Sequence, residues 1–273
     1  MAWRVRSAGV DRKAEGIYAR PAVKIWTMVE IAEGERFLAC GPLKEAGLPH
    51  AFTLKPSGPS SGGRSPGPPI AIVRHAGLDG GSRIAVPRQV HGRTVAVAAE
   101  DGRTHPLEAD AILVANGGAA AVATADCVGA VIFDPASGAF AVVHAGWRGT
   151  LAGILEAAVG RLVEVAAARA ESLILAMGPA IGGCCYEVGE EVAALSRAAF
   201  TGAGTEGIFG TRAGKTMIDL AAANRLRAIQ SGMLPERIHA AGICTACRPD
   251  LCCSYRSSGD GAGRMWTIAG RPR

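Results

Sequence analysis

Aromatic residues are scarce in this chain of 273 residues, at 5% of the sequence, and charged residues reach only 19%. Hydrophobic residues nevertheless make up 49%, so the chain is too apolar for intrinsic disorder and can bury a sizeable core. Much of this apolar content is alanine, so we expect a core with few large rings. The length favours one large domain over two small ones.

A concentrated basic region is also absent. The formal net charge is +5, but the 29 lysines and arginines are spread along the whole sequence. Nucleic-acid-binding domains gather basic residues on one face or helix, so this distribution argues against a nucleic-acid partner. A mild positive charge would still favour small anionic substrates such as phosphate.

The sequence lacks features of secretion and of membrane insertion. Its first six residues, MAWRVR, contain no apolar signal segment, so the eight cysteines favour a reducing compartment over a disulfide framework. The weakly charged stretch 111–133 carries only Asp126, but Asn116-Gly117-Gly118 interrupts it. A membrane-spanning helix needs about 20 apolar residues. We therefore predict a cytoplasmic protein without a membrane partner, as a monomer or small homo-oligomer.

Apolar periodicity predicts alternating strands and helices. Short apolar runs predict strands at 70–73, 95–98, 111–114, 130–133, 140–143, 173–177 and 238–244. Helical spacing begins after Thr150, a candidate N-cap, and further helices are expected at 188–199 and 219–230, the last ended by Gly232. The Pro/Gly/Ser-rich run at 56–69 predicts a flexible loop. These elements predict an α/β fold, layered as α+β, in a single domain with mixed sheets and helices.

Three polar segments follow predicted strands, where functional sites are often built. His144 opens the segment HAGWRG, and Arg148 in the same segment lies at an expected helix start, which suits phosphate or carboxylate binding. Asp126 and Cys127 end the segment TADC, and His91 lies in QVHG. Taken singly, each also fits an ordinary role: a hydrogen-bonded imidazole, a surface ion pair, an acid capping a turn or a buried inert thiol.

Together, His91, Cys127 and His144 supply three of the four ligands that zinc prefers and leave one position for water, as catalytic zinc sites do. No local ligand pattern such as CxxC supports this set, because the three residues are far apart in the chain. The residues alone therefore leave a metal site and unconnected side chains both open.

The ordered motifs resemble the YfiH-like family of laccase-domain (polyphenol oxidase) proteins, of the purine nucleoside phosphorylase type. The motifs are QVHG at 89–92, ADA at 109–111, TADC at 124–127, HAGWRG at 144–149, GPAIGGCCYEVG at 178–189, Asp219-Leu220, Cys244-Thr245, SYR at 254–256 and Gly263-Arg264. The resemblance covers residues 45–271, so we assign 1–44 to an N-terminal extension and 45–271 to the catalytic domain.

The resemblance implies a four-layer fold related to toxin deamidase-like cysteine hydrolases, with His91, Cys127 and His144 as zinc ligands. It implies phosphorolysis of adenosine, inosine and methylthioadenosine, and deamination of adenosine. Cys127, His144, Asp126 and Arg148 would be catalytic. Either Asp126 or Glu187 would orient a neighbouring group or carry a proton. Substrate contacts would come from Arg148, Glu187, Arg256 and Arg264.

Three other functions remain open. Cys127 and His144 could form a metal-free cysteine hydrolase or deamidase. Copper is possible at a site of two histidines and one cysteine, although six histidines are too few for the full copper set of a laccase. A binding protein without turnover is the third alternative, because 52–69 departs from the family pattern. Cys244-x-x-Cys247 and Cys252-Cys253 suggest either a second metal or redox site or structural thiols.

Overall fold

Two mixed β-sheets form the centre of the fold in the computed structural model, which describes residues 25–31, 34–55, 67–78, 84–99, 104–105 and 107–271. Over these residues, one sheet has the strand order β14-β11-β9-β10-β7-β5-β6 and the other β1-β2-β3-β15-β8-β4. Most neighbouring strands are antiparallel, but β5–β7, β11–β14 and β4–β8 are parallel. Both sheets are therefore mixed, as the sequence predicted.

The seven-stranded sheet carries the strands that matter most for the site. Its members are β5 (Val95–Ala98), β6 (Thr104–His105), β7 (Ala111–Val114), β9 (Val128–Phe133), β10 (Phe140–Ala145), β11 (Ile174–Met177) and β14 (Ile238–Ala240). The six-stranded sheet consists of β1 (Trp26–Glu30), β2 (Arg36–Cys40), β3 (His50–Thr53), β4 (Ile84–Ala85), β8 (Gly118–Thr124) and β15 (Met265–Arg271).

The central strands are apolar on both faces because the seven-stranded sheet is covered on both sides. Along β7, Ile112 and Val114 pack between the two sheets, whereas Ala111 and Leu113 pack toward helices. Successive side chains of a strand point to opposite faces, so this alternation follows from strand geometry. It explains why these strands appear in the sequence as continuous apolar runs.

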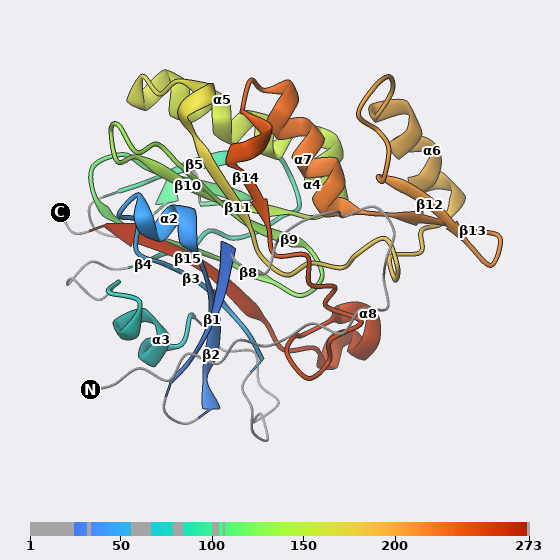
Figure 1. The fold of residues 1–273 in the computed structure, drawn as a ribbon, viewed down its shortest axis with the longest axis horizontal. Coiled ribbons are helices and arrows are strands. Elements are labelled where there is room, and N and C mark those ends of the chain that lie inside the picture. The colour runs from blue at the N-terminus through green and yellow to red at the C-terminus, as the bar shows by residue number, and fades with distance from the viewer. Residues whose placement is uncertain are drawn as a thin grey trace.

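Helices complete two outer layers. The helices α5 (Ile154–Ala166) and α7 (Leu220–Gln230) share one apolar cluster with the outer face of the seven-stranded sheet. Helix α3 (Ile70–His75) packs Val73 against Trp266 and Ile268 on the outer face of the other sheet. Figure 1 shows α5 and α7 on one side of the sheets and α3 on the opposite side. The order helix, sheet, sheet, helix gives four layers.

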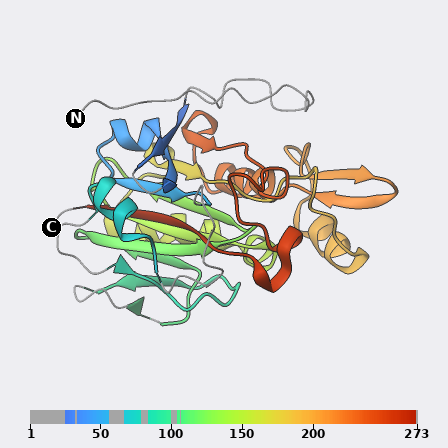
Figure 2. The same ribbon diagram turned by 90° about the horizontal axis from the view of Figure 1, so that it is seen from below.

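The remaining elements lie around this centre. They are α2 (Gly41–Glu45), α4 (Trp147–Ala152), α6 (Glu190–Ala199), α8 (Tyr255–Ser258), the hairpin β12 (Phe209–Arg212) and β13 (Lys215–Ile218), and short 3-10 turns at Ala170–Ser172, Pro235–Arg237 and Gly259–Gly261. Figure 2 shows α6 and the hairpin projecting together at one end of the molecule. No helix among the described residues is long and apolar enough to cross a membrane.

The predicted N-terminal extension, 1–44, contains β1, β2 and nearly all of α2, and β2 pairs with β3. The domain boundary at residue 45 stays a prediction. Most of the predicted flexible loop, 56–66, lies outside the described residues.

Three sequence predictions were wrong in detail. The strand predicted at 238–244 ends at Ala240. Ile70–Val73 is helical, not a strand, because so short an apolar run does not distinguish the two structures by its period. Thr150 is not an N-cap. It lies within α4, and Gly153, at φ 85°, separates α4 from α5. A left-handed residue at that point suits glycine and ends the first helix.

His50 provides a pH-dependent contribution to stability. Its Nε2 accepts a hydrogen bond from the Cys40 amide at 2.7 Å, and its Nδ1 lies 2.8 Å from the Leu48 carbonyl, which fixes a neutral tautomer. Burial lowers the pKa of His50 from 6.5 to about 4. The unfolded chain therefore binds a proton more readily between these values, and the stabilisation is complete above pH 6.5 and lost as the pH falls toward 4.

We expect the free energy of unfolding to fall by about 3 kcal/mol from this residue alone as the pH drops from neutrality to 4. Urea unfolding of the wild type and of His50→Gln across this range measures how steeply the free energy of unfolding changes with pH in each protein. The exposed His75 provides a matched control, His75→Gln, which should keep the wild-type slope. Equal slopes for the wild type and His50→Gln would contradict the assignment.

Candidate metal centre

Cys127 and His144 meet because their strands are neighbours. Cys127 directly precedes β9, and His144 lies near the end of β10, where it pairs with Gly129. The next pair in the register, Ala145 with Val128, places the Cys127 backbone beside the end of β10. Residues separated in sequence thus reach one edge of the sheet.

His91 reaches the same edge from the loop before β5. Its backbone has φ 60°, a left-handed conformation that a non-glycine residue adopts only when its surroundings hold it there. The ring centroids of His91 and His144 are 4.8 Å apart, with the planes at 84°. The potential ligand atoms of His91, Cys127 and His144 all lie within 4.8 Å of one another.

Gly146 permits this close approach. A Cβ atom at that position would lie 2.9 Å from Cδ2 of His91 and 3.0 Å from the sulfur of Cys127. Gly149 plays a similar part, since a Cβ there would lie 2.9 Å from the Gly92 carbonyl oxygen. The glycines of the HAGWRG segment therefore make room for the His91 loop.

Asp110 organises the centre, although the sequence analysis did not select it as a site residue. The carboxylate is fully buried and accepts hydrogen bonds from the backbone amides of His91 at 2.9 Å and Gly92 at 2.6 Å. The same carboxylate lies 2.8 Å from Nδ1 of His144. The signal that could have found Asp110 is its place in the ADA motif, directly before a fully buried strand.

The electrostatics favour a thiolate beside an imidazolium in the metal-free centre. Burial raises the pKa of Cys127, but hydrogen bonds with His144 and His91 outweigh it and lower the pKa to about 7. Burial likewise opposes protonation of His144, but Asp110 and Cys127 raise its pKa to about 9. The thiol is thus prepared for ionisation, which metal ligation requires.

Asp126, next to the centre, holds the neighbouring loops. It is buried, at φ 88°, and its two carboxylate oxygens accept hydrogen bonds from the Thr245 hydroxyl and, at 2.7 Å, from the Arg256 amide. Its backbone carbonyl accepts from the Ile181 amide at 2.8 Å. The predicted role of Asp126 as orienter or proton carrier stays a prediction.

Arg148 and Arg256 place positive charge around Tyr186. The Arg256 guanidinium lies 5.3 Å from the Tyr186 ring centroid, and Arg148 stacks at 4.2 Å over Trp147. Burial is the main cause that raises the pKa of Tyr186 to about 12. The charge of Cys127 raises this pKa further, whereas those of Arg256 and Arg148 lower it, so all three act on one phenol.

The two other residues predicted to contact substrate, Glu187 and Arg264, bind groups of the protein itself. The Glu187 carboxylate pairs with Lys215 at 2.7 Å, while its backbone carbonyl accepts from Arg256 at 2.8 Å. Arg264 donates to the carbonyls of Ala262 and Gly263, within its own loop. Glu187 thus adjoins the arginine side of the site through its backbone.

The fold and the centre define a layered α/β enzyme with two histidines and one cysteine gathered at a sheet edge. The family described as multi-copper polyphenol oxidoreductase laccase has a model that matches residues 71–271. The chain belongs to this family and is an enzyme. The resemblance stated from the motifs is confirmed.

Relatives with assigned activities support this placement. A purine nucleoside phosphorylase of Deinococcus radiodurans is 37% identical over 240 residues, which span 83% of this chain and 90% of that protein. Adenosine deaminase RL5, from an unknown prokaryotic organism, is 35% identical over 193 residues, 67% of this chain and 73% of that protein. The crystal structure of YlmD from Geobacillus stearothermophilus matches with a TM-score of 0.78 and 26% identity, covering 90% of this chain and 99% of that one.

Replacing Asp110 by asparagine tests the organisation of the centre. Carboxylate partners of ligating histidines typically strengthen metal affinity by roughly 10–100-fold, so a metal ion held by the expected ligands His91, Cys127 and His144 should bind that much more weakly in Asp110→Asn. Competition with a chelator of known affinity measures it. Asp134→Asn is the matched control, because Asp134 is also buried and accepts amide hydrogen bonds in the turn after β9. Equal affinities of Asp110→Asn and the wild type would refute the role.

Proposed function

We propose that the enzyme is a zinc-dependent purine nucleoside phosphorylase with adenosine deaminase activity at the same centre. Two considerations support this proposal: the activities named for the similar proteins from Deinococcus radiodurans and RL5, and the chemistry of the centre. The substrates would be adenosine, inosine or methylthioadenosine together with phosphate.

The convergence of His91, Cys127 and His144 carries the proposal. Two imidazoles and a thiol, with donor atoms within 4.8 Å of one another, fit the ligand set of a catalytic zinc site. The Asp110 carboxylate forms a hydrogen bond with Nδ1 of His144, so the other ring nitrogen, Nε2, is left to coordinate the metal ion. Zinc bound there would supply Lewis-acid stabilisation of developing negative charge.

The arginines would bind phosphate in phosphorolysis. Guanidinium groups form paired hydrogen bonds with phosphate oxygens, and Arg148 and Arg256 both act electrostatically on Tyr186 beside the centre. A phosphate oxygen would form a bond to C1′ of the ribose as the glycosidic bond breaks. The purine would leave with the bonding electrons and take up a proton.

Deamination would use the same pocket without phosphate. Water would add to C6 of adenosine, and the amino group would leave as ammonia after protonation.

We propose that Asp126 positions the Arg256 backbone, because both carboxylate oxygens of Asp126 already accept hydrogen bonds. Glu187 would hold the Arg256 side chain through its carbonyl, and Arg264 would shape the adjacent loop.

Product analysis tests the reaction. Adenosine incubated with metal-quantified protein should give adenine only when phosphate is present, and inosine in its absence. His91→Ala removes a ligand and should reduce both products by at least about 100-fold, the scale set by loss of a catalytic electrostatic group. Absence of both products from protein with zinc bound at this centre would refute the purine assignment.

The same experiment distinguishes the alternatives. The pKa of about 7 at Cys127, beside His144, also suits a thiolate nucleophile in a metal-free hydrolase. Turnover that survives complete chelation, with covalent trapping of Cys127, would favour that function. Turnover restored by copper but not by zinc would favour a copper enzyme.

Arg148→Gln tests the phosphate site. Loss of a hydrogen bond to a charged group costs about 1.5–3 kcal/mol, so KM for phosphate should rise roughly tenfold to hundredfold. Steady-state assays at varied phosphate measure it, with Arg161→Gln as the matched control, because Arg161 pairs with Glu164 on α5. An unchanged KM for phosphate in Arg148→Gln would contradict the assignment.

A further inference from the structure

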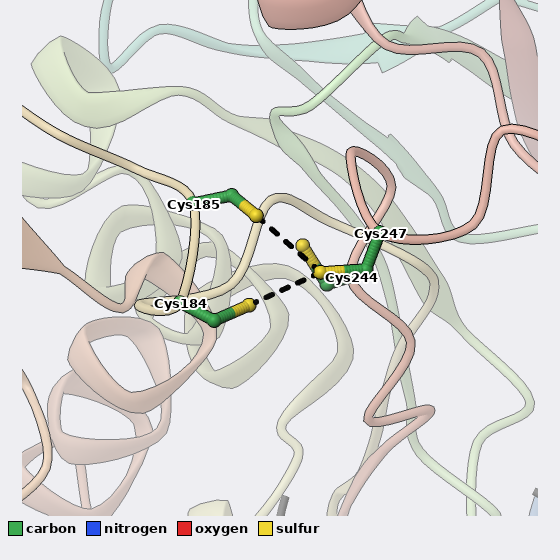
Figure 3. Close-up of side chains that lie close together, drawn as sticks. All are labelled: Cys184, Cys185, Cys244 and Cys247. Atoms are coloured by element: carbon green, nitrogen blue, oxygen red, sulfur yellow. Dashed lines mark hydrogen bonds between the residues drawn. The ribbon is translucent and has the colours of Figure 1, made fainter. Parts of the chain in front are cut away.

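A second cluster of possible ligands lies apart from the His91, Cys127 and His144 centre. Cys184 and Cys185 come from the loop after β11, and Cys244 and Cys247 come from the loop after β14. Figure 3 shows the sulfur atoms of the two loops turned toward one another. All four sulfurs lie within 4.8 Å of one another.

The sulfur spacing fits one bound ion. The sulfur of Cys247 is 3.6 Å from that of Cys184 and 3.3 Å from that of Cys185. A tetrahedral zinc ion with bonds of about 2.3 Å to sulfur requires sulfurs roughly 3.8 Å apart. All four cysteines have free thiols, and a disulfide would need a separation of about 2.05 Å.

Backbone hydrogen bonds hold the two loops in place before any ion binds. The Ala180 amide donates to the Ile243 carbonyl at 3.2 Å, and the Thr245 amide donates to the Ala180 carbonyl at 3.1 Å. The Gly182 amide donates to the sulfur of Cys244 at 3.3 Å. Amide hydrogen bonds to a ligand sulfur orient it and stabilise its thiolate, as outer partners do in metal sites.

The negative charge of four neighbouring thiolates would also favour the binding of a cation. The four sulfurs lie within 4.8 Å of one another, so four thiolates here would repel one another. A divalent ion would remove this repulsion and allow all four thiols to ionise. The Arg212 guanidinium, which donates to the Cys184 carbonyl at 2.7 Å, adds positive charge nearby.

The partners of Cys244 and Cys247 are not those suggested by the sequence, where Cys252-Cys253 follows them most closely. Cys252 is instead buried in the core between the sheets, and burial raises its pKa to about 12. Cys253 packs against the same core. Only the fold places the CCY segment at 184–186 beside the CTAC segment at 244–247.

We propose that Cys184, Cys185, Cys244 and Cys247 bind a second zinc ion, with a structural role. Four protein ligands complete a tetrahedral site and leave no position for substrate or water. Sulfur-rich tetrahedral sites select zinc or iron–sulfur clusters, and a single ion fits the spacing of these sulfurs.

The ion would fasten the two loops that hold Asp126. From the loop after β11, the Ile181 amide donates to the Asp126 carbonyl, and from the loop after β14, the Thr245 hydroxyl donates to the Asp126 carboxylate. Asp126 precedes Cys127 directly. The four-cysteine site would thus hold the centre of His91, Cys127 and His144 in position without contacting substrate.

Zinc content of purified variants tests the proposal, independently of any turnover. The variant Cys127→Ala loses a ligand of the first centre and should still retain one zinc ion per chain. The triple variant Cys127→Ala, Cys184→Ser, Cys247→Ser should retain none. Cys127→Ala with Cys253→Ser is the matched control and should retain one. Circular dichroism verifies that each variant is folded.

Cobalt replacement gives a second measurement on the Cys127→Ala variant. Cobalt bound by four thiolates gives intense sulfur-to-metal charge-transfer absorption and tetrahedral visible bands, which should vanish in the triple variant. A folded, reduced Cys127→Ala variant that retains no zinc and gives no such spectrum would overturn the proposal. So would a disulfide linking Cys247 to Cys184 or Cys185 in protein purified without oxidant.

Discussion

The buried carboxylate of Asp110 is the contact on which the centre depends. It accepts amide hydrogen bonds from the His91 loop and a hydrogen bond from the His144 ring, so one group joins a loop to a strand end. Asp110 directly precedes β7. Strand β7 pairs with β10, and its first residue, Ala111, lies opposite Val143, the neighbour of His144. Removing one partner of a buried ion pair typically lowers the free energy of unfolding by about 3–5 kcal/mol, so the pair of Asp110 and His144 depends on the presence of both residues.

Small residues allow the layers to approach closely enough for this contact to form. The strands β7, β9 and β10 are buried on both faces, and alanine and glycine recur along them and along β8. Gly129 illustrates the constraint, since a Cβ atom there would clash with the Thr267 hydroxyl group on β15. The scarcity of aromatic residues is therefore consistent with two sheets packed tightly face to face, and the site lies at their edge.

The two clusters of possible ligands would serve different roles. The first offers three donors, and the charges of Cys127, Arg148 and Arg256 all act on Tyr186, which suits a centre that binds anionic substrate. The second has four sulfurs and no further position, as a structural site requires. Asp126 connects them, because loops from the second cluster donate hydrogen bonds to the residue next to Cys127.

Apolar periodicity along the sequence was enough to predict the α/β class and most strands of the seven-stranded sheet. The selection of His91, Cys127 and His144 as one site needed the family resemblance that the ordered motifs carry. Apolar periodicity missed the strands of the six-stranded sheet, such as the alanine-rich β8, because segments of this kind become strands through the partners with which they pair. Tertiary structure alone decided that Asp110 supports His144 and that Cys184 and Cys185 join Cys244 and Cys247. These contacts link residues 34 to 63 positions apart, and no local propensity specifies such distances.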